Sequence, residues 1–187
     1  MPILNRAAEL QDEVTEWRRH IHTRPELLYA VENTAAFVAE KLREFGVDEV
    51  VTGIGRTGVV GLIRGHGEGR TVGLRADMDA LPLTEITGKP WASQTPGKMH
   101  ACGHDGHTAM LLGAAKYLAE TRNFSGNVAV IFQPAEEGGA GGDAMVKDGM
   151  MERFQIAEVY GMHNLPGLAV GQFAIRKGAI MAATDEF

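Results

Sequence analysis

The sequence predicts an α/β fold in which helices pack on both faces of a buried sheet. Segments with apolar residues at helical spacing alternate along the chain with short, near-continuous apolar runs, which are typical of strands covered on both sides. The chain of 187 residues is long enough for one domain with a sizeable core, and its 44% of hydrophobic and 22% of charged residues are ordinary for a globular protein.

Helices are expected wherever apolar residues recur every three or four positions. The first runs through residues 4–21 and ends before Pro25, because the residue before a proline disfavours the helical conformation. The second covers residues 34–45, with Gly46 in the position of a C-cap. Two further helices are expected at residues 108–119 and, as a shorter one, at residues 144–149.

Buried strands are expected from apolar runs rich in β-branched residues. Residues 64–69, which are rich in glycine, separate the first two strands and are interpreted as a tight hairpin loop. Residues 81–99 contain three prolines and two glycines and are expected to form a long loop. The expected strands are residues 59–63, 71–74, 127–132, 158–162 and 170–175.

Charge and composition argue against several classes of protein. The net charge is −6, and the densest basic cluster, Arg18-Arg19-His20, lies within a helical pattern, so a solvated helix face explains it better than a nucleic-acid site. No apolar stretch approaches the roughly 20 residues that span a bilayer, and the N-terminus lacks the apolar run of a secretion signal. Cys102 is the only cysteine, which suits a reducing compartment. A cytoplasmic protein without nucleic-acid or membrane partners is therefore expected.

One short motif concentrates potential metal ligands, His100-Ala-Cys-Gly-His-Asp-Gly-His107, directly before the helix expected at residue 108. Cys102 and His104 are two positions apart on a glycine-kinked loop and can both reach one cation, of a kind such as Zn, Co, Ni or Mn rather than Ca or Mg. In the alternative interpretation, Cys102 is simply buried and Asp105 caps the following helix. Three histidines, a cysteine and an aspartate within eight residues favour the metal site.

Two adjacent acids, Glu136 and Glu137, follow the apolar run of residues 127–132. Such carboxylates repel each other unless a cation offsets their charge. With a metal present, one can ligate it while the other accepts a proton from water. The alternative is a solvated acidic turn, since glycines follow. His163 stands at the exit of another expected strand, where a histidine is either a metal ligand or a polar residue with ordinary hydrogen bonds.

Asp77 and Asp79 come at the end of the strand expected at residues 71–74. Their alternate positions put them on the same face of an extended backbone. Such carboxylates could orient histidine ligands through hydrogen bonds, and Asp79 is the better candidate. They could instead pair with Arg75 or cap a turn.

Five segments, in this order, resemble the amidohydrolase branch of the peptidase M20 family. This branch contains hippurate hydrolases, N-acyl-amino-acid amidohydrolases and auxin–amino-acid conjugate hydrolases, and the similarity runs from about Trp17 to the last residue. The segments are RRHIHTRPELLYAVENTA, GLRADMDALPLTE, HACGHDGHTAMLLGAA, IFQPAEEGGAGG and VYGMHNLPGLAVG.

The resemblance implies a zinc-aminopeptidase-like three-layer sandwich with a mixed, mostly buried central sheet. It also implies two divalent metal ions, which could be Zn, Mn, Co or Ni. In this branch Cys102 would bridge the metals and His104 would bind one of them, while Glu137 and His163 would complete further ligand positions. Glu136 would be the general base that activates water. Asp79, together with Asp77 and Asp105 as further candidates, would support the ligands.

The implied activity is hydrolysis of the amide bond of small N-acyl amino acids. The segments around Asp77 and Cys102 favour this branch, because dipeptidases and carboxypeptidases of the wider family usually carry a histidine and an aspartate at these two positions. Three alternatives stay open: a dipeptidase or carboxypeptidase, a metal-binding or interaction module without catalysis, and a cysteine hydrolase that uses Cys102 with His104 or His163.

The resemblance also implies that residues 1–187 are the first segment of the catalytic domain, which would be incomplete at its C-terminus. An inserted lid or dimerisation domain, beginning near Phe187, and a final catalytic segment with one more histidine ligand would be absent. The complete protein is then expected to be a homodimer or homotetramer. The segment alone is expected to be inactive and to expose apolar surface that favours self-association.

Overall fold

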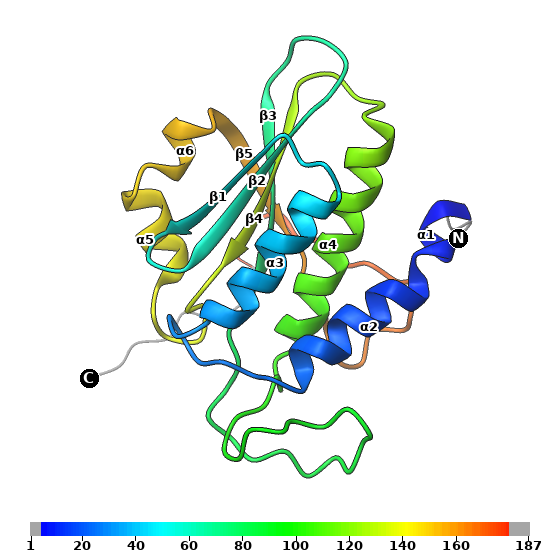
Figure 1. The fold of residues 1–187 in the computed structure, drawn as a ribbon, viewed down its shortest axis with the longest axis vertical. Helices are drawn as coiled ribbons and strands as arrows, with labels where there is room; N and C mark the ends of the chain where they lie inside the picture. Colours follow the sequence, from blue (N-terminus) through cyan, green and yellow to red (C-terminus); the bar gives the residue numbers. More distant parts are fainter. Residues whose placement is uncertain (1–4, 180–187) are drawn as a thin grey trace.

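The computed structural model describes residues 5–179 and shows three layers, with a five-stranded sheet between two groups of helices (Figure 1). Helices α3 and α4 cover one face of the sheet, α2 packs on α4, and α5 and α6 lie on the other face. The α/β sandwich predicted from the sequence is confirmed. The helices are α1 (Asn5–Glu9), α2 (Gln11–His22), α3 (Glu32–Glu44), α4 (His104–Thr121), α5 (Gly141–Lys147) and α6 (Met150–Arg153). The strands are β1 (Glu49–Ile54), β2 (Gly58–Arg64), β3 (Thr71–Asp77), β4 (Asn127–Gln133) and β5 (Ile156–Gly161).

The sheet is mixed, in the order β1-β2-β4-β3-β5. Strands β1 and β2 form an antiparallel pair, as do β2 and β4, whereas β3 is parallel to both β4 and β5. The hairpin expected at residues 64–69 is therefore wrong, because β4 lies between β2 and β3. The loop crosses the start of β4 instead. The N–H groups of Gly65 and His66 donate hydrogen bonds to the carbonyls of Gly126 and Phe124, which lie just before β4.

The core has two halves, one on each side of the sheet, because successive strand residues point to opposite faces. In β2, Val59 and Ile63 pack under α3 and α4, while Val60 and Leu62 pack under α5 and α6. Strand β4 divides in the same way and is buried from Ala129 to its end, as its apolar run predicted.

Helix boundaries differ from the expectation at three places. The helix expected at residues 4–21 is divided at Leu10 into α1 and α2, and an ion pair of Arg6 with Glu120 holds α1 against the end of α4. Helix α5 begins at Gly141, three residues earlier than expected, and α6 follows it. Most importantly, α4 begins at His104 rather than at residue 108, because Gly103 turns the chain directly into the helix with a φ of +96°.

Strand predictions fail at the two ends of the sheet. Strand β1 was not expected; it is a half-exposed edge strand without a continuous apolar run. Strand β5 was expected to be buried, but after Ile156 its residues are exposed. Residues 170–175 form no strand, and Val170, Phe173 and Ile175 are exposed, because the described residues offer this segment no neighbouring strand to pair with.

The long loop expected at residues 81–99 is confirmed, and its two ends are joined by a β-bridge between Leu81 and Met99. Residues 1–4 and 180–187 lie outside the described part, and with them the first residue of the first expected helix and the expected start of a lid domain near Phe187. Within residues 5–179, the structure has no helix that combines the length and the hydropathy of a membrane span.

Candidate metal centre

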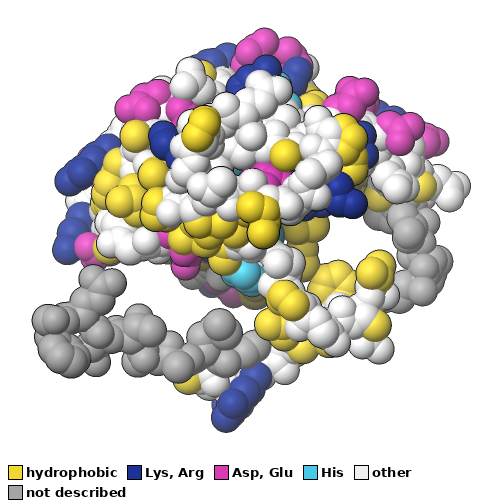
Figure 2. Space-filling model, turned by 90° about the horizontal axis from the view of Figure 1, so that it is seen from below, with side chains coloured by type: hydrophobic (Ala, Val, Ile, Leu, Met, Phe, Trp, Pro, Cys, Tyr) yellow, Lys and Arg dark blue, Asp and Glu magenta, His cyan; other side chains and the backbone are white. Residues whose placement is uncertain are grey.

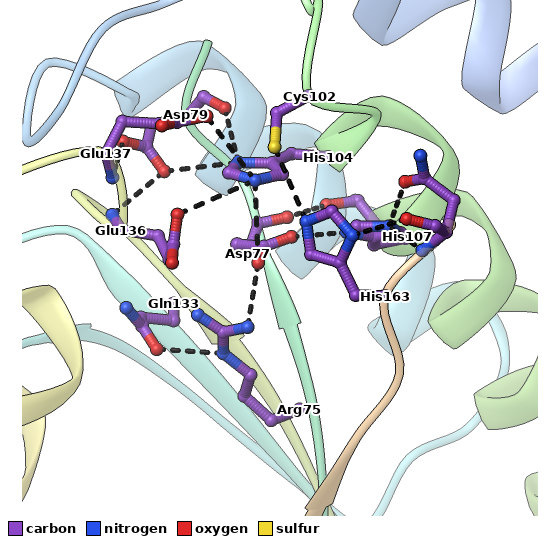
Figure 3. Close-up of polar contacts among 12 residues, drawn as sticks. Arg75, Asp77, Asp79, Cys102, His104, His107, Gln133, Glu136, Glu137 and His163 are labelled. Atoms are coloured by element: carbon purple, nitrogen blue, oxygen red, sulfur yellow. Dashed lines mark hydrogen bonds and ion pairs between the residues drawn. The ribbon is translucent and has the colours of Figure 1, made fainter. Parts of the chain in front are cut away.

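The candidate site lies where the carboxyl ends of β3, β4 and β5 meet the first turn of α4 (Figure 3). These three strands are parallel, so the residues that follow them emerge at one edge of the sheet. That edge is where sites form in α/β proteins. Chain direction thus brings together Asp77 from β3, Glu136 from the turn after β4, and His163 from the segment after β5.

His104 is at the centre of this cluster and is fully buried. Its Nδ1 lies 2.8 Å from the carbonyl oxygen of Asp79, to which it donates a hydrogen bond. Its Nε2 has no hydrogen-bond partner among the described residues, yet lies 3.7 Å from a carboxylate oxygen of Glu136 and 3.7 Å from one of Glu137. Burial lowers the pKa of His104, but the nearby side chain of Asp79 and the negative charges of Asp77 and Glu137 outweigh it, so the pKa is raised above its ordinary value.

Three sets of potential ligand atoms share His104, and within each set the atoms lie no more than 4.8 Å apart. The structure therefore brings together the four residues expected to bind metal and the expected base, which come from three distant parts of the sequence. Their individual roles remain predictions. The sets are Cys102, His104 and His163; His104, Glu136 and Glu137; and Asp77, His104 and His107.

The Cys102 thiol faces His163, with 3.4 Å between Sγ and Nε2. Burial and the negative charge of Glu137 raise the pKa of Cys102 to about 12, so without a cation the side chain is a neutral thiol at physiological pH. A cysteine can bind a metal ion only as the thiolate, so cation binding at a neutral thiol releases a proton.

Asp79 holds the backbone of the two adjacent acids. Its Oδ1 accepts the N–H of Glu136 at 3.0 Å and its Oδ2 accepts the N–H of Glu137 at 3.1 Å. Oδ1 also lies 3.5 Å from Nδ1 of His104. The carboxylate of Asp79 therefore caps this turn, which is one of the roles left open for it, and it also lies beside His104. Its support of a metal ligand stays a prediction.

Asp77 connects the end of β3 to α4. Its Oδ1 lies 2.7 Å from Nδ1 of His107, and its Oδ2 accepts a hydrogen bond of 2.7 Å from Arg75. Burial raises the pKa of Asp77, but the hydrogen bond from His107 and the charge of Arg75 outweigh it and lower the pKa to about 2. Asp77 therefore orients a histidine and pairs with Arg75, although that histidine was not among the expected ligands.

His107 is part of the motif singled out in the sequence, but the sequence analysis gave it no role at the site. Its Nδ1 faces Asp77, and its Nε2 lies 3.1 Å from the backbone nitrogen of Asn164, next to His163 (Figure 3). A side chain on Gly103 would overlap Asn164, so the close approach of these segments requires glycine there. The three-residue spacing of His104 and His107 puts them on one helix face, but only once the helix is known to begin at His104.

Asp105 does not face His104. Neighbouring residues on a helix point about 100° apart, and Asp105 points toward α2, where its Oδ2 accepts hydrogen bonds from Arg18 at 3.0 Å and His22 at 2.8 Å. It belongs to none of the three ligand sets, and its side chain does not cap α4. Burial raises the pKa of Asp105, but the bond from His22 and nearby positive charge lower it below its ordinary value.

The chemistry of these residues fits divalent cations. Nε2 of His104 and Oε1 of Glu137 are buried without a hydrogen-bond partner among the described residues, which is costly for polar atoms unless something else binds them. Sulfur, imidazole nitrogen and carboxylate oxygen together are the donors that zinc and similar transition metals prefer.

Residues 73–183 match the family model described as peptidase family M20/M25/M40. The hippurate hydrolase of Campylobacter jejuni is 48% identical over 187 residues, which are 100% of this chain and 48% of that protein. Thermostable carboxypeptidase 1 of Saccharolobus solfataricus is 49% identical over 187 residues, covering 98% of this chain and 47% of that protein.

Among solved structures, the YXEP protein of Bacillus subtilis, described as a dinuclear metal-binding peptidase of the M20 family, has a TM-score of 0.86. It is 37% identical, over 91% of this chain and 47% of that protein. The chain thus spans about half the length of the curated relatives it matches. The matched model covers most of the sequence, including every candidate ligand, and the chain belongs to peptidase family M20/M25/M40.

Proposed function

We propose that residues 1–187 form the first segment of a metal-dependent catalytic domain that hydrolyses the amide bond of small N-acyl amino acids. The observation that carries this proposal is the convergence of thiol, imidazole and carboxylate groups on the buried Nε2 of His104. The similarity to a hippurate hydrolase supports the substrate class, because hippurate is an N-acyl amino acid.

In this proposal two divalent cations would be held by Cys102, His104, Glu137 and His163. When bound, the cations supply Lewis acidity that acidifies water and polarises the amide carbonyl. The protein contributes the preformed arrangement, in which Asp79 fixes both His104 and the turn that carries Glu137.

Glu136 is proposed as the general base. Its side chain is 40% exposed, whereas that of Glu137 is 18% exposed, so the two acids differ in access to substrate and water. The more buried carboxylate suits a ligand, and the more open one suits proton transfer. Glu136 would accept a proton from the attacking water and return it to the leaving amine.

The test is Glu136→Gln in the complete polypeptide that carries these residues. We expect cation binding to persist and turnover to fall about 100-fold or more, because the amide cannot accept the proton. Calorimetry with Zn²⁺ or Mn²⁺ and a hydrolysis assay with hippurate measure the two properties. Glu152→Gln, on α6, is the matched control and should change neither. Turnover near the wild-type rate in Glu136→Gln would show that the assigned base is wrong.

A second candidate is removal of C-terminal residues from peptides, which the similarity to a thermostable carboxypeptidase favours. A panel of N-benzoyl, N-acetyl and indole-acyl amino acids, assayed beside free dipeptides, separates the two candidates. Preference for the acyl amino acids supports the amidohydrolase proposal, and exclusive cleavage of peptides refutes it. Removal of metal with a chelator should abolish either activity, and adding back Zn, Mn, Co and Ni separately would identify the metal.

A further inference from the structure

His22 is buried at the end of α2 and lies between two carboxylates. Its Nδ1 is 2.8 Å from Oδ2 of Asp105, and its Nε2 is 3.2 Å from Oε2 of Glu85. All three side chains are at most 8% exposed. An ionised carboxylate can only accept hydrogen bonds, so both ring nitrogens of His22 donate.

The contact with Asp105 reaches the first turn of α4, next to His104. Arg18 also bonds to Asp105, but its side chain is 55% exposed, so His22 is the buried partner. The other oxygen of Asp105 has no partner among the described residues. Hydrogen bonds between charged groups that are shielded from water are strong, so the bond from His22 largely determines where this carboxylate lies.

The side of α4 that carries His104 is tied to the end of β3 and to the residues that follow it. His104 donates from Nδ1 to the carbonyl of Asp79 at 2.8 Å, and Thr108 donates from Oγ1 to the carbonyl of Asp77 at 2.7 Å. Asp105 provides the only side-chain hydrogen bonds from this turn to α2 among the described residues. The turn is thus fixed from two directions, and the direction of Nε2 of His104 depends on both.

The contact with Glu85 reaches the loop of residues 81–99, which leads into the segment that carries Cys102. Glu85 also accepts the N–H of Ser93 at 2.6 Å, so its carboxylate closes this loop on itself. The β-bridge between Leu81 and Met99 joins the two ends of this loop, and Met99 lies three residues before Cys102. His22 therefore joins the two segments on either side of Cys102, namely this loop and α4.

We propose that His22 is a positioning residue for the metal centre, which acts through Asp105 on His104 and through Glu85 on the segment before Cys102. The inference rests on the proposed function only in that cations bind at this centre. His22 touches neither cation nor substrate, and its effect is to restrict rotation of the first turn of α4.

A double-mutant cycle on cation affinity tests the proposal in the complete polypeptide. The variants are His22→Gln, Asp105→Asn and the two combined, with the dissociation constant for Mn²⁺ measured by calorimetry. We expect each single change to weaken binding about tenfold, as for other groups that orient metal ligands. The combined loss in the double variant should be smaller than the sum of the two single losses, because both changes remove the hydrogen bond between His22 and Asp105.

The matched control is His20→Gln, which changes an exposed histidine on the same helix and should leave affinity unchanged. A second measurement is the ring ¹H–¹⁵N spectrum of His104 in metal-free protein, whose signals should shift in His22→Gln and not in His20→Gln. Thermal unfolding shows whether each variant is folded. Asp105→Asn, which preserves the side-chain shape, keeps the test available if His22→Gln does not fold.

Wild-type affinity in His22→Gln, or fully additive losses in the double variant, would overturn the inference while leaving the proposed function intact. A wild-type protein that binds no cation would instead refute the proposed function. In that case the His104 ring spectrum still decides the role of His22, since unchanged signals in His22→Gln contradict it and shifted signals support it.

Discussion

Glu136 and Glu137 show how strongly position within the fold changes the chemistry of one residue type. They are adjacent and chemically identical, and both backbone N–H groups bond to Asp79. Yet an oxygen of Glu137 is buried without a hydrogen-bond partner among the described residues, while the Glu136 side chain is 40% exposed. The single carboxylate of Asp79 sets this geometry, since it positions both backbone groups.

We expect Asp79→Asn to weaken cation binding about tenfold, because the amide keeps only one of the two acceptor oxygens that hold the turn. The free energy of unfolding should fall by about 1–2 kcal/mol for the lost hydrogen bond. Calorimetry with Zn²⁺ and urea unfolding measure the two effects. Asp143→Asn, an exposed acid on α5 that pairs with Lys147, is the control. Unchanged affinity in Asp79→Asn would contradict the role given to this carboxylate.

Among the helices and strands, Arg122 and Asp48 connect three segments of the fold at a place distant from the metal centre. Arg122, directly after α4, donates to Asp48 at 2.7 Å, to the carbonyl of Arg64 at 2.9 Å and to that of Gly46 at 2.9 Å. Asp48 also accepts the N–H of Arg64 at 2.8 Å. The end of α4, the turn after α3 and the end of β2 are therefore held together by one ion pair.

Stability should depend on pH through this pair. Burial raises the pKa of Asp48, but the hydrogen bonds from Arg64 and Arg122 outweigh it, so the folded pKa lies below the ordinary value of 3.8. A depressed pKa contributes stability that is present above the unfolded value and is lost as the pH falls through the folded value. We expect Asp48→Asn to cost about 1 kcal/mol at pH 7, with the difference from wild type shrinking below pH ~4. Urea unfolding from pH 7 to pH 3 measures this, and a difference independent of pH would contradict it.

At the scale of the whole molecule, one face carries apolar side chains that nothing in the described chain covers. In Figure 2, hydrophobic side chains gather on the face seen from below, around a hollow in which a histidine is visible. The exposed apolar residues of β5 and the segment after it are Val159, Tyr160, Met162, Leu165, Leu168, Val170, Phe173 and Ile175. Exposed apolar side chains in such number favour association with another surface.

We expect the isolated chain of residues 1–187 to self-associate at micromolar concentration, and the double change Phe173→Ser and Ile175→Ser to reduce this. These side chains are 73% and 98% exposed, so folding should not depend on them. Sedimentation velocity measures association, and thermal unfolding should be unchanged. Ile86→Ser, at a position 94% exposed on the loop of residues 81–99, is the control and should leave association as it is. A monomeric wild-type chain would contradict the prediction.

Local patterns along the chain were enough to predict most helices and strands and to identify the residues of the candidate site. Helical and apolar periodicity are local properties, so α3, the body of α4, β2, β3 and β4 could be read directly from the chain. The motif around Cys102 and the acids at positions 136 and 137 could also be recognised, because each is a dense local group of side chains with metal-binding chemistry. Boundaries at glycines were less predictable, and the start of α4 at His104 was missed for that reason.

Features that depend on contacts between distant segments could not be predicted from these local patterns and became visible in the folded chain. The position of β4 between β2 and β3 follows from strand pairing, which the hydrophobic pattern of one strand does not encode. The hydrogen bond of His22 with Asp105 joins residues 83 positions apart, and that of Asp79 with Glu136 joins residues 57 apart. The hydrogen-bond partner of a side chain depends on its position after the core has packed. The acids and histidines of the site could therefore be identified from the sequence, but their partners could be identified only from the fold.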